Sequence, residues 1–276
     1  MPELPEVQTI VNDLNAADLI GVPISGAKVF WARTIAEPSP GLFCNRLKGR
    51  KFTAIHRRGK HLVFETDNEN TMLLHLRMSG RLHLVSADMP RIKHEHVIIK
   101  FNDKRQLRFH DTRKFGRIHL TKDPAKILNR LGPEPLEKGF TVKVLADRLR
   151  RHKRLLKPLL LDQTFIAGLG NIYVDEALWD VKLHPNRIAA TLSMNEIKAL
   201  HCAIPKVLKR GLKNLGTSLG TGKTNFYSVA RNRGRNKDEL KVFRRTDLPC
   251  PRCKTAIERI MVGQRSTHIC SKCQII

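Results

Sequence analysis

The sequence has few acidic residues and no long apolar segment. It contains 25 Asp and Glu against 51 Lys and Arg, which gives a formal net charge of +26. No apolar run approaches the roughly 20 residues that a helix needs to cross a bilayer. The first residues include acids, where a secretory signal peptide would have basic and then apolar residues. These absences argue against a membrane-spanning or exported protein, and we expect a cytosolic chain with reduced thiols.

The positive excess indicates the kind of partner. A chain with this charge repels itself unless a polyanion neutralises it, and DNA or RNA is the natural candidate. A basic membrane-surface protein is the competing interpretation, but the sequence has no clean basic amphipathic helix and no lipidation signal. A generally basic proteome would explain a modest excess, not +26. We therefore expect nucleic-acid binding that weakens steeply with salt.

The first half of the chain predicts one helix followed by strands. Val7, Ile10, Val11 and Leu14 recur at helical spacing, which predicts an amphipathic helix over residues 6–14. Short apolar segments separated by Gly, Asn and Asp follow, a pattern typical of an antiparallel sandwich or barrel. The predicted strands are Ala27–Trp31, Lys51–His56, His61–Glu65, Met72–Leu76, Arg81–Val85, His96–Phe101, Gln106–His110 and Gly116–Leu120.

The second half predicts helices and a long loop. Residues 131–135, Leu-Gly-Pro-Glu-Pro, break both periodicities and suggest a domain boundary. Residues 216–239 are rich in Gly, Asn and basic residues and predict a loop, which at this length is usually functional or disordered. We expect three parts, over residues 1–133, 134–239 and 240–276. The predicted helices are Val142–Arg151, Arg154–Leu161, Asn171–Val181 and Ser193–Leu212.

Four of the six cysteines form two Cys-x-x-Cys pairs, Cys250 with Cys253 and Cys270 with Cys273, sixteen residues apart. This spacing predicts a structural zinc site, in which four thiolates complete the tetrahedral coordination. Redox pairs or disulfides are the alternative, which paired knuckles in a cytosolic chain make less favourable. The segments 257–262 and 266–269 predict two strands of a hairpin with 263–265 at its tip.

The N-terminal residues Pro2, Glu3 and Glu6 allow two interpretations. If Met1 is removed, Pro2 carries a secondary amine with a pKa of about 8, which can attack a carbonyl-like carbon and form an imine. The neighbouring carboxylates could then transfer the protons that this chemistry needs. The alternative is a simple helix start, in which Pro occupies the first turn and Glu favours the positive end of the helix dipole.

Together these features resemble the formamidopyrimidine-DNA glycosylase family. The resemblance rests on Pro-Glu-Leu-Pro-Glu at residues 2–6, on Leu-Gly-Asn-Ile-Tyr at 169–173 and on residues 250–274 around the cysteines. It implies an α+β multidomain fold: an N-terminal helix with an antiparallel β-sandwich, a helical helix-two-turn-helix domain and a zinc-binding β-hairpin. It also implies an enzyme that excises oxidised purines from duplex DNA and then cuts the strand.

The resemblance assigns catalytic and DNA-contact roles by position. Pro2 matches the nucleophile, Glu3 the acid that assists ring opening, Glu6 a carboxylate that organises the site, and Lys60 a phosphate-binding catalytic lysine. The plain alternatives are that Lys60 is an ordinary hairpin-turn lysine and that Asn171 caps a helix. The resemblance also implies DNA contacts. The side chains that fill the space of the flipped nucleotide are Met78, Arg113 and Phe115. The other implied contacts are His94, Asn171 and Arg265.

Side-chain chemistry alone gives the insertion residues another reading. An apolar and an aromatic side chain can replace lost base stacking, and an arginine can hydrogen-bond an orphaned base. However, Met and Phe are usually buried, so Met78 and Phe115 could equally be core residues. Because the target carbon is hidden inside the duplex, the reaction requires base flipping.

The sequence departs from the family near its C-terminal third. Many members carry Tyr-Gly-Arg before the zinc site, where this chain has Phe243-Arg244-Arg245, and the loop before it is also unusual. Gly222-Lys223-Thr224 resembles the end of a phosphate-binding loop but lacks the first glycine and the preceding strand. The resemblance therefore predicts which base is removed less well than it predicts the chemistry at the DNA sugar-phosphate backbone.

The expected partner is damaged double-stranded DNA, with no membrane, and the expected state is a nucleoid-associated monomer with one structural zinc. The proposed chemistry needs no Mg²⁺ or organic cofactor. Three alternatives remain: a sister glycosylase for oxidised pyrimidines, whose usual start has Gly in place of Leu4; a DNA-binding protein without catalysis; and a zinc-ribbon RNA-binding accessory protein.

Overall fold

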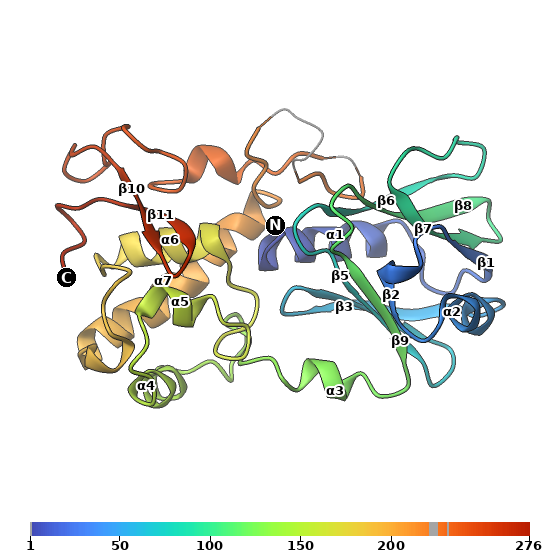
Figure 1. Cartoon of the computed structure of the whole chain (residues 1–276), viewed down its shortest axis with the longest axis horizontal. Coiled ribbons are helices and arrows are strands. Elements are labelled where there is room, and N and C mark those ends of the chain that lie inside the picture. Colours follow the sequence, from blue (N-terminus) through green and yellow to red (C-terminus); the bar gives the residue numbers. More distant parts are fainter. Residues whose placement is uncertain (1, 221–225, 231) are drawn as a thin grey trace. The chain divides into compact units, whose positions relative to one another are not determined.

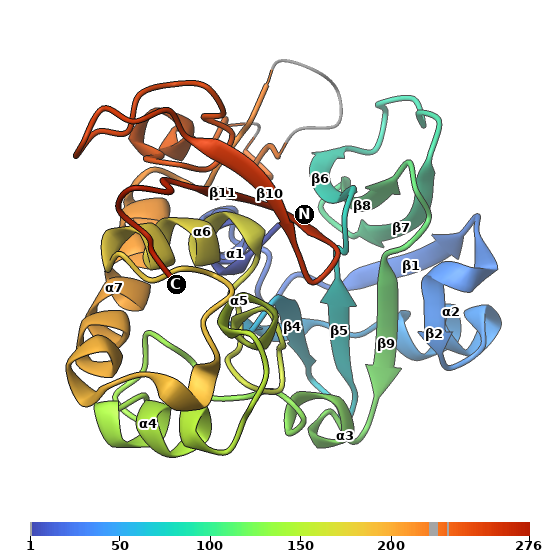
Figure 2. The same ribbon diagram turned by 60° about the vertical axis from the view of Figure 1, so that its left-hand side comes forward.

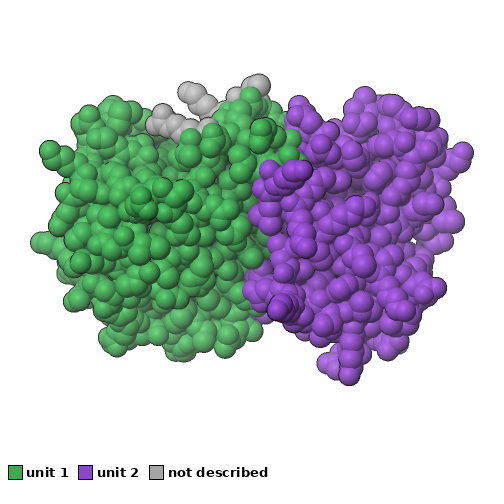
Figure 3. All heavy atoms as spheres, turned by 180° about the vertical axis from the view of Figure 1, so that it is seen from behind, with its two compact units in different colours: residues 1–129, 214–235 green, residues 130–213, 236–276 purple. Residues whose placement is uncertain are grey.

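The computed structural model describes residues 2–220, 226–230 and 232–276 (Figure 1). Backbone contacts divide the chain into two compact units, coloured separately in Figure 3. Unit 1 contains residues 1–129 and 214–235, and unit 2 contains residues 130–213 and 236–276. Residues 214–235 thus group with the N-terminal part, although they follow the helices in sequence. The three-part division at residues 133 and 239 stays a prediction.

Unit 1 begins with the predicted helix, which is confirmed as α1 (Leu4–Ala16). Glu3 and Glu6 form a capping box at its start, and a proline occupies its first turn, so the local sequence supplies the expected start signals. Val7, Ile10 and Leu14 are at most 1% exposed, as their spacing predicts. The helix therefore contributes its apolar face to the core of unit 1.

Two sheets form the sandwich of unit 1. One sheet has the order β1-β7-β8-β6 and the other the order β2-β9-β5-β4-β3. Neighbouring strands are antiparallel except that β2 runs parallel to β9. The predicted strands are confirmed, and β2 and helix α2 (Pro40–Leu47) are additions. The strands are β1 (Ile24–Val29), β2 (Ile35–Glu37), β3 (Phe52–Arg58), β4 (His61–Thr66), β5 (Thr71–His75), β6 (Gly80–Ser86), β7 (Glu95–Phe101), β8 (Arg105–Asp111) and β9 (Arg117–Thr121).

The core of unit 1 joins both sheets and α1. Phe52 lies at its centre, with ring centroids 5.0 Å from Phe64 and 6.1 Å from Phe101, which come from different sheets. These three rings are at most 3% exposed. Fully burying such a side chain stabilises a fold by about 1.5–3 kcal/mol. The same packing fixes where the loops at the strand ends emerge.

Unit 2 is helical and ends in a hairpin (Figure 2). The predicted helices are confirmed, and the predicted hairpin forms from β10 (Glu258–Val262) and β11 (Arg265–Ile269). At the hairpin tip, Gly263 has a φ of +54° and lies against Pro158, where a Cβ would be 2.7 Å from a ring carbon. The helices of unit 2 are α4 (Val142–Arg150), α5 (Leu156–Leu160), α6 (Asn171–Asp180) and α7 (Met194–Lys213). The short helix α3 (Ala125–Leu128) precedes them and belongs to unit 1.

The predicted long loop contains little regular structure where it is described. Isolated bridges join Thr217 to Arg235 and Tyr227 to Arg233, and a short 3-10 helix covers Asn236–Glu239. The Gly222-Lys223-Thr224 sequence and Arg231 lie outside the described residues. No helix in the described ranges combines the length and apolarity that a bilayer crossing requires.

Candidate functional site

The N-terminal segment of unit 1 is held by the carboxylate of Glu6. The Glu3 N–H donates to Glu6 Oε2 at 2.9 Å, and the Thr217 N–H donates to Glu6 Oε1 at 2.7 Å. Pro2, Glu3 and Glu6 are all buried. Both oxygens of Glu6 therefore accept backbone hydrogen bonds, one from the start of the chain and one from a residue 211 positions later. This carboxylate positions the segment that carries Pro2.

Gly216 allows the loop to approach this carboxylate. Its φ is +82°, and a Cβ there would lie 2.9 Å from Cγ of Glu6 and 3.1 Å from Cε1 of Phe226. Any side chain would therefore be strained by the backbone conformation and would collide with Glu6. The glycine is required by both effects.

Lys60 lies in the two-residue turn between β3 and β4 and is only 4% exposed. Arg57 fixes this turn, since its Nη1 donates to the Gly59 carbonyl at 3.0 Å and its Nε donates to Gln8 of α1 at 3.1 Å. The turn is thus attached to the helix that begins next to Pro2. The burial of Lys60 makes an ordinary exposed turn lysine a poor description of this residue.

Two histidines beside Lys60 are held in the neutral form. The rings of His61 and His75 meet edge to face, with centroids 4.7 Å apart. Burial, assisted by the positive charge of Arg77, lowers the pKa of His61 to about 4. Burial, with the charges of His61, Arg77 and Lys60, lowers the pKa of His75 to about 2. The Lys60 ammonium therefore sits beside uncharged imidazoles at neutral pH.

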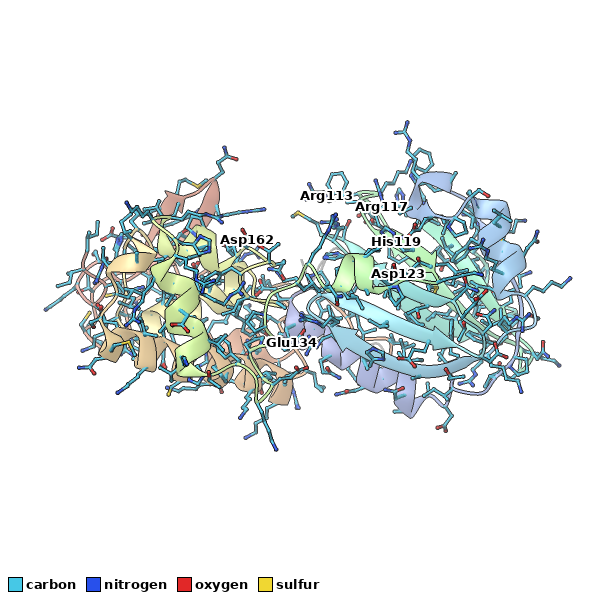
Figure 4. The ribbon with its side chains drawn as sticks, turned by 90° about the horizontal axis from the view of Figure 1, so that it is seen from below. Arg113, Arg117, His119, Asp123, Glu134 and Asp162 are labelled. Carbon is cyan, nitrogen blue, oxygen red and sulfur yellow. The ribbon has the colours of Figure 1, made fainter. Side chains whose placement is uncertain are left out.

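Met78, Arg113 and Phe115 form an exposed group on unit 1. Met78 is 42% exposed and Phe115 is 47% exposed, so the interpretation of these two as core residues is wrong. Arg113 Nη1 lies 3.6 Å from the Met78 sulfur, and the Arg113 guanidinium carbon lies 4.8 Å from the centroid of the Phe115 ring. The three side chains thus meet one another although they come from different loops. In Figure 4, Arg113 and Arg117 lie near one another where this loop enters β9.

Asp111 determines the shape of the loop that carries Arg113 and Phe115. Its buried carboxylate accepts hydrogen bonds from the Gly116 N–H at 2.7 Å, from the Arg113 N–H at 3.2 Å and from the Ser79 hydroxyl. Ser79 follows Met78 directly, so one carboxylate organises both loops. Sequence reasoning did not single out this aspartate.

His94 lies beside the same loop. The Asp111 N–H donates to the His94 carbonyl at 3.0 Å, and the His94 ring lies 5.9 Å from His110 and 6.3 Å from His96. The His94 backbone has a φ of +71°, in the left-handed region. Burial and the charge of Arg81 lower the pKa of His110.

In unit 2, Asn171 and Arg265 are brought to the same place. Asn171 is the first residue of α6, after the N-cap Gly170, so it is not the helix cap. Its Nδ2 donates to the Ser266 carbonyl at 2.8 Å, next to the exposed Arg265. The first turn of α6 is thereby attached to the start of β11.

A fully buried ion pair holds the same strand. Lys157 Nζ lies 2.5 Å from Asp175 Oδ1 and donates to Thr267 Oγ1 at 2.8 Å and to the Ser266 carbonyl at 3.2 Å. The second Asp175 oxygen accepts from the His268 N–H at 3.0 Å. Both side chains are 0% exposed. Sequence reasoning missed this pair, and the only signal was a lysine within the apolar helix α5.

The four cysteines fit a tetrahedral metal site. Their sulfur atoms all lie within 4.8 Å of one another, with Cys250 to Cys273 at 4.0 Å and Cys253 to Cys270 at 3.3 Å. Four thiolates on a zinc ion at about 2.3 Å would place sulfurs roughly 3.8 Å apart. Disulfides would require about 2.05 Å, and all four are free thiols. The disulfide alternative is therefore wrong for this structure.

Comparison with known proteins identifies the family. Three family models match: "Formamidopyrimidine-DNA glycosylase N-terminal domain" over residues 1–118, "Formamidopyrimidine-DNA glycosylase H2TH domain" over 131–222 and "Zinc finger found in FPG and IleRS" over 247–275. A formamidopyrimidine-DNA glycosylase of Protochlamydia amoebophila is 47% identical over 274 residues, 99% of each chain. The chain belongs to the formamidopyrimidine-DNA glycosylase family.

Other relatives agree in sequence and in fold. The formamidopyrimidine-DNA glycosylase of Herpetosiphon aurantiacus is 44% identical over 99% of this chain and 100% of its own. The solved complex of Lactococcus lactis Fpg with abasic-site DNA has a TM-score of 0.90 and 36% identity, with 99% of both chains covered. A second Lactococcus lactis complex, with Fapy-dG-containing DNA, gives the same values. The predicted fold class is confirmed.

The structure shows how this formamidopyrimidine-DNA glycosylase family member accommodates its Phe243-Arg244-Arg245 departure. Arg244 has a φ of +57°, a conformation that favours glycine, which many family members have there. The buried Glu176 carboxylate accepts the N–H groups of Val242 at 2.9 Å and of Phe243 at 3.1 Å just before it. Glu176 therefore fixes the backbone just before Arg244, whose side chain is exposed.

Proposed function

We propose that this protein is a base-excision DNA glycosylase and abasic-site lyase that removes oxidised purines, 8-oxoguanine and formamidopyrimidines, from duplex DNA. The proposal rests on full-length similarity to formamidopyrimidine-DNA glycosylases, including solved complexes with damaged DNA. The sister activity on oxidised pyrimidines is less favoured, because the N-terminal sequence has Leu4 where those enzymes usually have Gly.

Pro2 is the proposed nucleophile. Once Met1 is removed, its secondary amine has an ordinary pKa of about 8, so part of it is unprotonated at neutral pH. The nitrogen attacks C1′ of the damaged nucleotide and the C1′–N bond to the base breaks. The base leaves with the proton that the Pro2 amine loses on forming the new bond. Glu3 supplies the proton that opens the sugar ring, which leaves an imine between Pro2 and C1′. The bond from the Glu3 N–H to Glu6 supports this role by fixing the peptide after Pro2.

Strand cutting follows from the imine. The positively charged imine acidifies the C2′ proton, and its removal expels the 3′ phosphate by β-elimination. A second elimination then expels the 5′ phosphate, which leaves a one-nucleotide gap with phosphates at both ends. Lys60 is proposed to bind a phosphate of the reacting nucleotide, and its ammonium beside the neutral His61 and His75 supports this.

The remaining predicted residues are proposed DNA contacts. Met78 and Phe115 would fill the space of the flipped nucleotide, and Arg113 would hydrogen-bond the orphaned base; their exposure and mutual contact support this. Asn171 and Arg265 would bind phosphates. His94 would contact DNA beside Met78, Arg113 and Phe115, which we call the insertion group.

The metal and the oligomeric state belong to the same proposal. Zinc is the proposed ion, because four thiolates with this geometry suit it and leave no open position for catalysis. Metal analysis should find one zinc per chain, and none in Cys270→Ser. We propose that the enzyme acts as a monomer, which sedimentation with and without DNA would check.

Borohydride trapping tests the proposed chemistry. The protein is mixed with a duplex containing one 8-oxoguanine, reduced, and its N-terminal peptide is analysed by mass spectrometry. We expect a covalent adduct on Pro2. A matched variant that retains Met1 should bind the same duplex without forming the adduct.

The outcomes separate the alternatives. No adduct with 8-oxoguanine or with a pre-formed abasic site, from a protein that lacks Met1 and binds DNA, would favour a non-catalytic DNA-binding protein. Faster excision of oxidised pyrimidines than of 8-oxoguanine would favour the sister activity. Tighter binding to RNA than to damaged DNA and to matched undamaged DNA would favour the RNA-binding accessory protein.

A further inference from the structure

Two aromatic side chains beside the insertion group carry stacked cations. Phe30 is 39% exposed, with the Arg91 guanidinium 4.2 Å and the Lys28 ammonium 5.2 Å from its ring centroid. The Lys114 ammonium lies 3.9 Å from the ring centroid of Trp31. We call these five residues, Lys28, Phe30, Trp31, Arg91 and Lys114, the aromatic–cation strip. None of the chemistry described above uses them.

The strip is built on the β1–β7 edge of the sandwich. The Phe30 N–H donates to the His96 carbonyl at 2.8 Å, which continues the pairing of β1 with β7. Arg91 Nη1 donates to the Glu95 carbonyl at 3.2 Å. The Trp31 ring lies 6.4 Å from His96, whose Nε2 is 2.8 Å from the Asp111 carbonyl. The strip is therefore linked through His96 to Asp111, the residue at which β8 ends and the loop of Arg113 and Phe115 begins.

The strip carries a large local excess of positive charge. Residues 26–34, 89–94 and 112–117 contain seven Lys and Arg and no acidic residue. Asp88, next to the second segment, is exposed, but the two other acids that adjoin these segments are used internally: Glu95 pairs with Arg108 at 3.2 Å, and Asp111 binds backbone N–H groups. Both are at most 2% exposed. This surface therefore suits a polyanion.

The stacking determines which part of a polyanion would bind. An ammonium or guanidinium group over a ring is held in place by the ring quadrupole while its outer N–H groups remain available. The ring faces are already occupied by cations, so they do not offer a free platform for stacking a base, as proteins that bind single strands do. Cations that are held over rings, with their outer N–H groups available, instead suit phosphate groups.

We propose that the aromatic–cation strip binds the phosphate backbone of the duplex arm next to the nucleotides displaced by Arg113 and Phe115. The inference rests on the proposed function. Lys114 lies between Arg113 and Phe115 in the chain, so the strip begins at the insertion group itself. Its role is to hold the DNA on one side of the kink while the insertion side chains enter the duplex.

The salt dependence of binding gives the expected magnitude. Each phosphate neutralised contributes about −0.9 to the slope of log K against log salt. Replacing Lys28, Arg91 and Lys114 together by Gln should make this slope less steep by about 2.7. Raising the salt from 50 to 200 mM weakens binding of both proteins. The factor by which the affinity falls should be about 40 times smaller for this variant than for the unchanged protein.

A charge-matched control uses exposed cations elsewhere on unit 1. Lys48 and Lys51 lie near the end of β3 that is remote from Lys60, and Lys100 lies near the end of β7 that is remote from His94. Changing these three to Gln removes the same charge and should leave the salt slope nearly unchanged. Binding is measured by fluorescence anisotropy with a duplex that contains a tetrahydrofuran abasic analogue, which cannot react.

A second variant tests the stacking directly. Trp31→Ala keeps every cation but removes the ring under Lys114, and we expect a roughly two- to fivefold loss of affinity. Adding Lys114→Gln to Trp31→Ala should then cost less than Lys114→Gln alone, because the two residues act together.

The results distinguish the strip from the proposed function. If the unchanged protein gives no trapped imine, the proposed function fails. If it does trap DNA but the strip variant keeps the full salt slope, or matches the control variant, the strip inference is wrong while the function stands.

Discussion

The buried pair of Lys157 and Asp175 offers the sharpest test of how unit 2 holds its hairpin. The Lys157 ammonium reaches Asp175, Thr267 and the Ser266 carbonyl, with both charged side chains fully buried. Lys157→Met preserves the length and volume of the side chain but removes its charge. Asp175 would then be a buried carboxylate that retains only its contacts with His268.

The expected cost is large. Removing one partner of a buried ion pair typically costs about 3–5 kcal/mol, because the remaining charge is uncompensated. A domain usually has about 5–15 kcal/mol of unfolding free energy, so at least about a fifth of it would be lost. Unit 2 contains one of the two tryptophans of the chain, Trp179. In a Trp31→Phe background, urea unfolding followed by fluorescence therefore reports on unit 2 alone.

An exposed pair in the same unit provides the control. Lys206 lies 2.9 Å from Asp180 but is 64% exposed, so Lys206→Met should cost below about 1 kcal/mol. Adding Asp175→Asn to Lys157→Met should recover part of the loss, because no buried charge then remains. If Lys157→Met is no more destabilising than Lys206→Met, the argument from burial is refuted.

Two further results are expected. His61 and His75 bind protons near pH 6.5 when unfolded but only near pH 4 and pH 2 when folded, so their stabilising effect is complete above about pH 6.5 and lost on acidification. The free energy of unfolding should therefore fall as the pH is lowered below about 6.5, and urea midpoints of His75→Gln should depend less on pH; an unchanged slope would contradict this. Chelating the metal should alter Trp179 fluorescence, because this ring packs with Cys250 and Cys270; no change after confirmed metal loss would contradict the four-thiolate site.

Periodicity predicted most elements of the fold but not all. Apart from β2, the strands of the sandwich are five to seven residues long and form short apolar segments between turn residues, which is long enough for the pattern to be recognised. Strand β2 has only three residues and α2 only eight, so each gives too short a pattern to be distinguished from a loop. The parallel pairing of β2 with β9 depends on tertiary contacts that a local pattern does not contain.

The residues of the candidate site also fall into those that a local motif predicts and those that only the structure shows. The residue types and the family resemblance located the N-terminal segment, Lys60 and the cysteines, since each belongs to a local motif. The exposure of Met78 and Phe115 ran against the usual burial of these residue types and required the structure. The partners of buried charges were also unpredictable, because Glu6 bonds to Thr217 across 211 positions and Lys157 to Thr267 across 110.

The scarcity of acids and the strength of the positive surface are two aspects of one arrangement. Glu6, Asp111, Asp175 and Glu176 are each about 1% exposed, and each accepts backbone N–H groups from a segment that carries or adjoins a candidate functional residue. A carboxylate in such a position satisfies several donors at once and fixes the segment through charge-assisted hydrogen bonds. Because these acids act inside the fold, they neutralise little of the surface. Fewer carboxylates therefore remain outside to compete for the exposed cations, and the same residues that shape the loops leave a positive excess that attracts a polyanion.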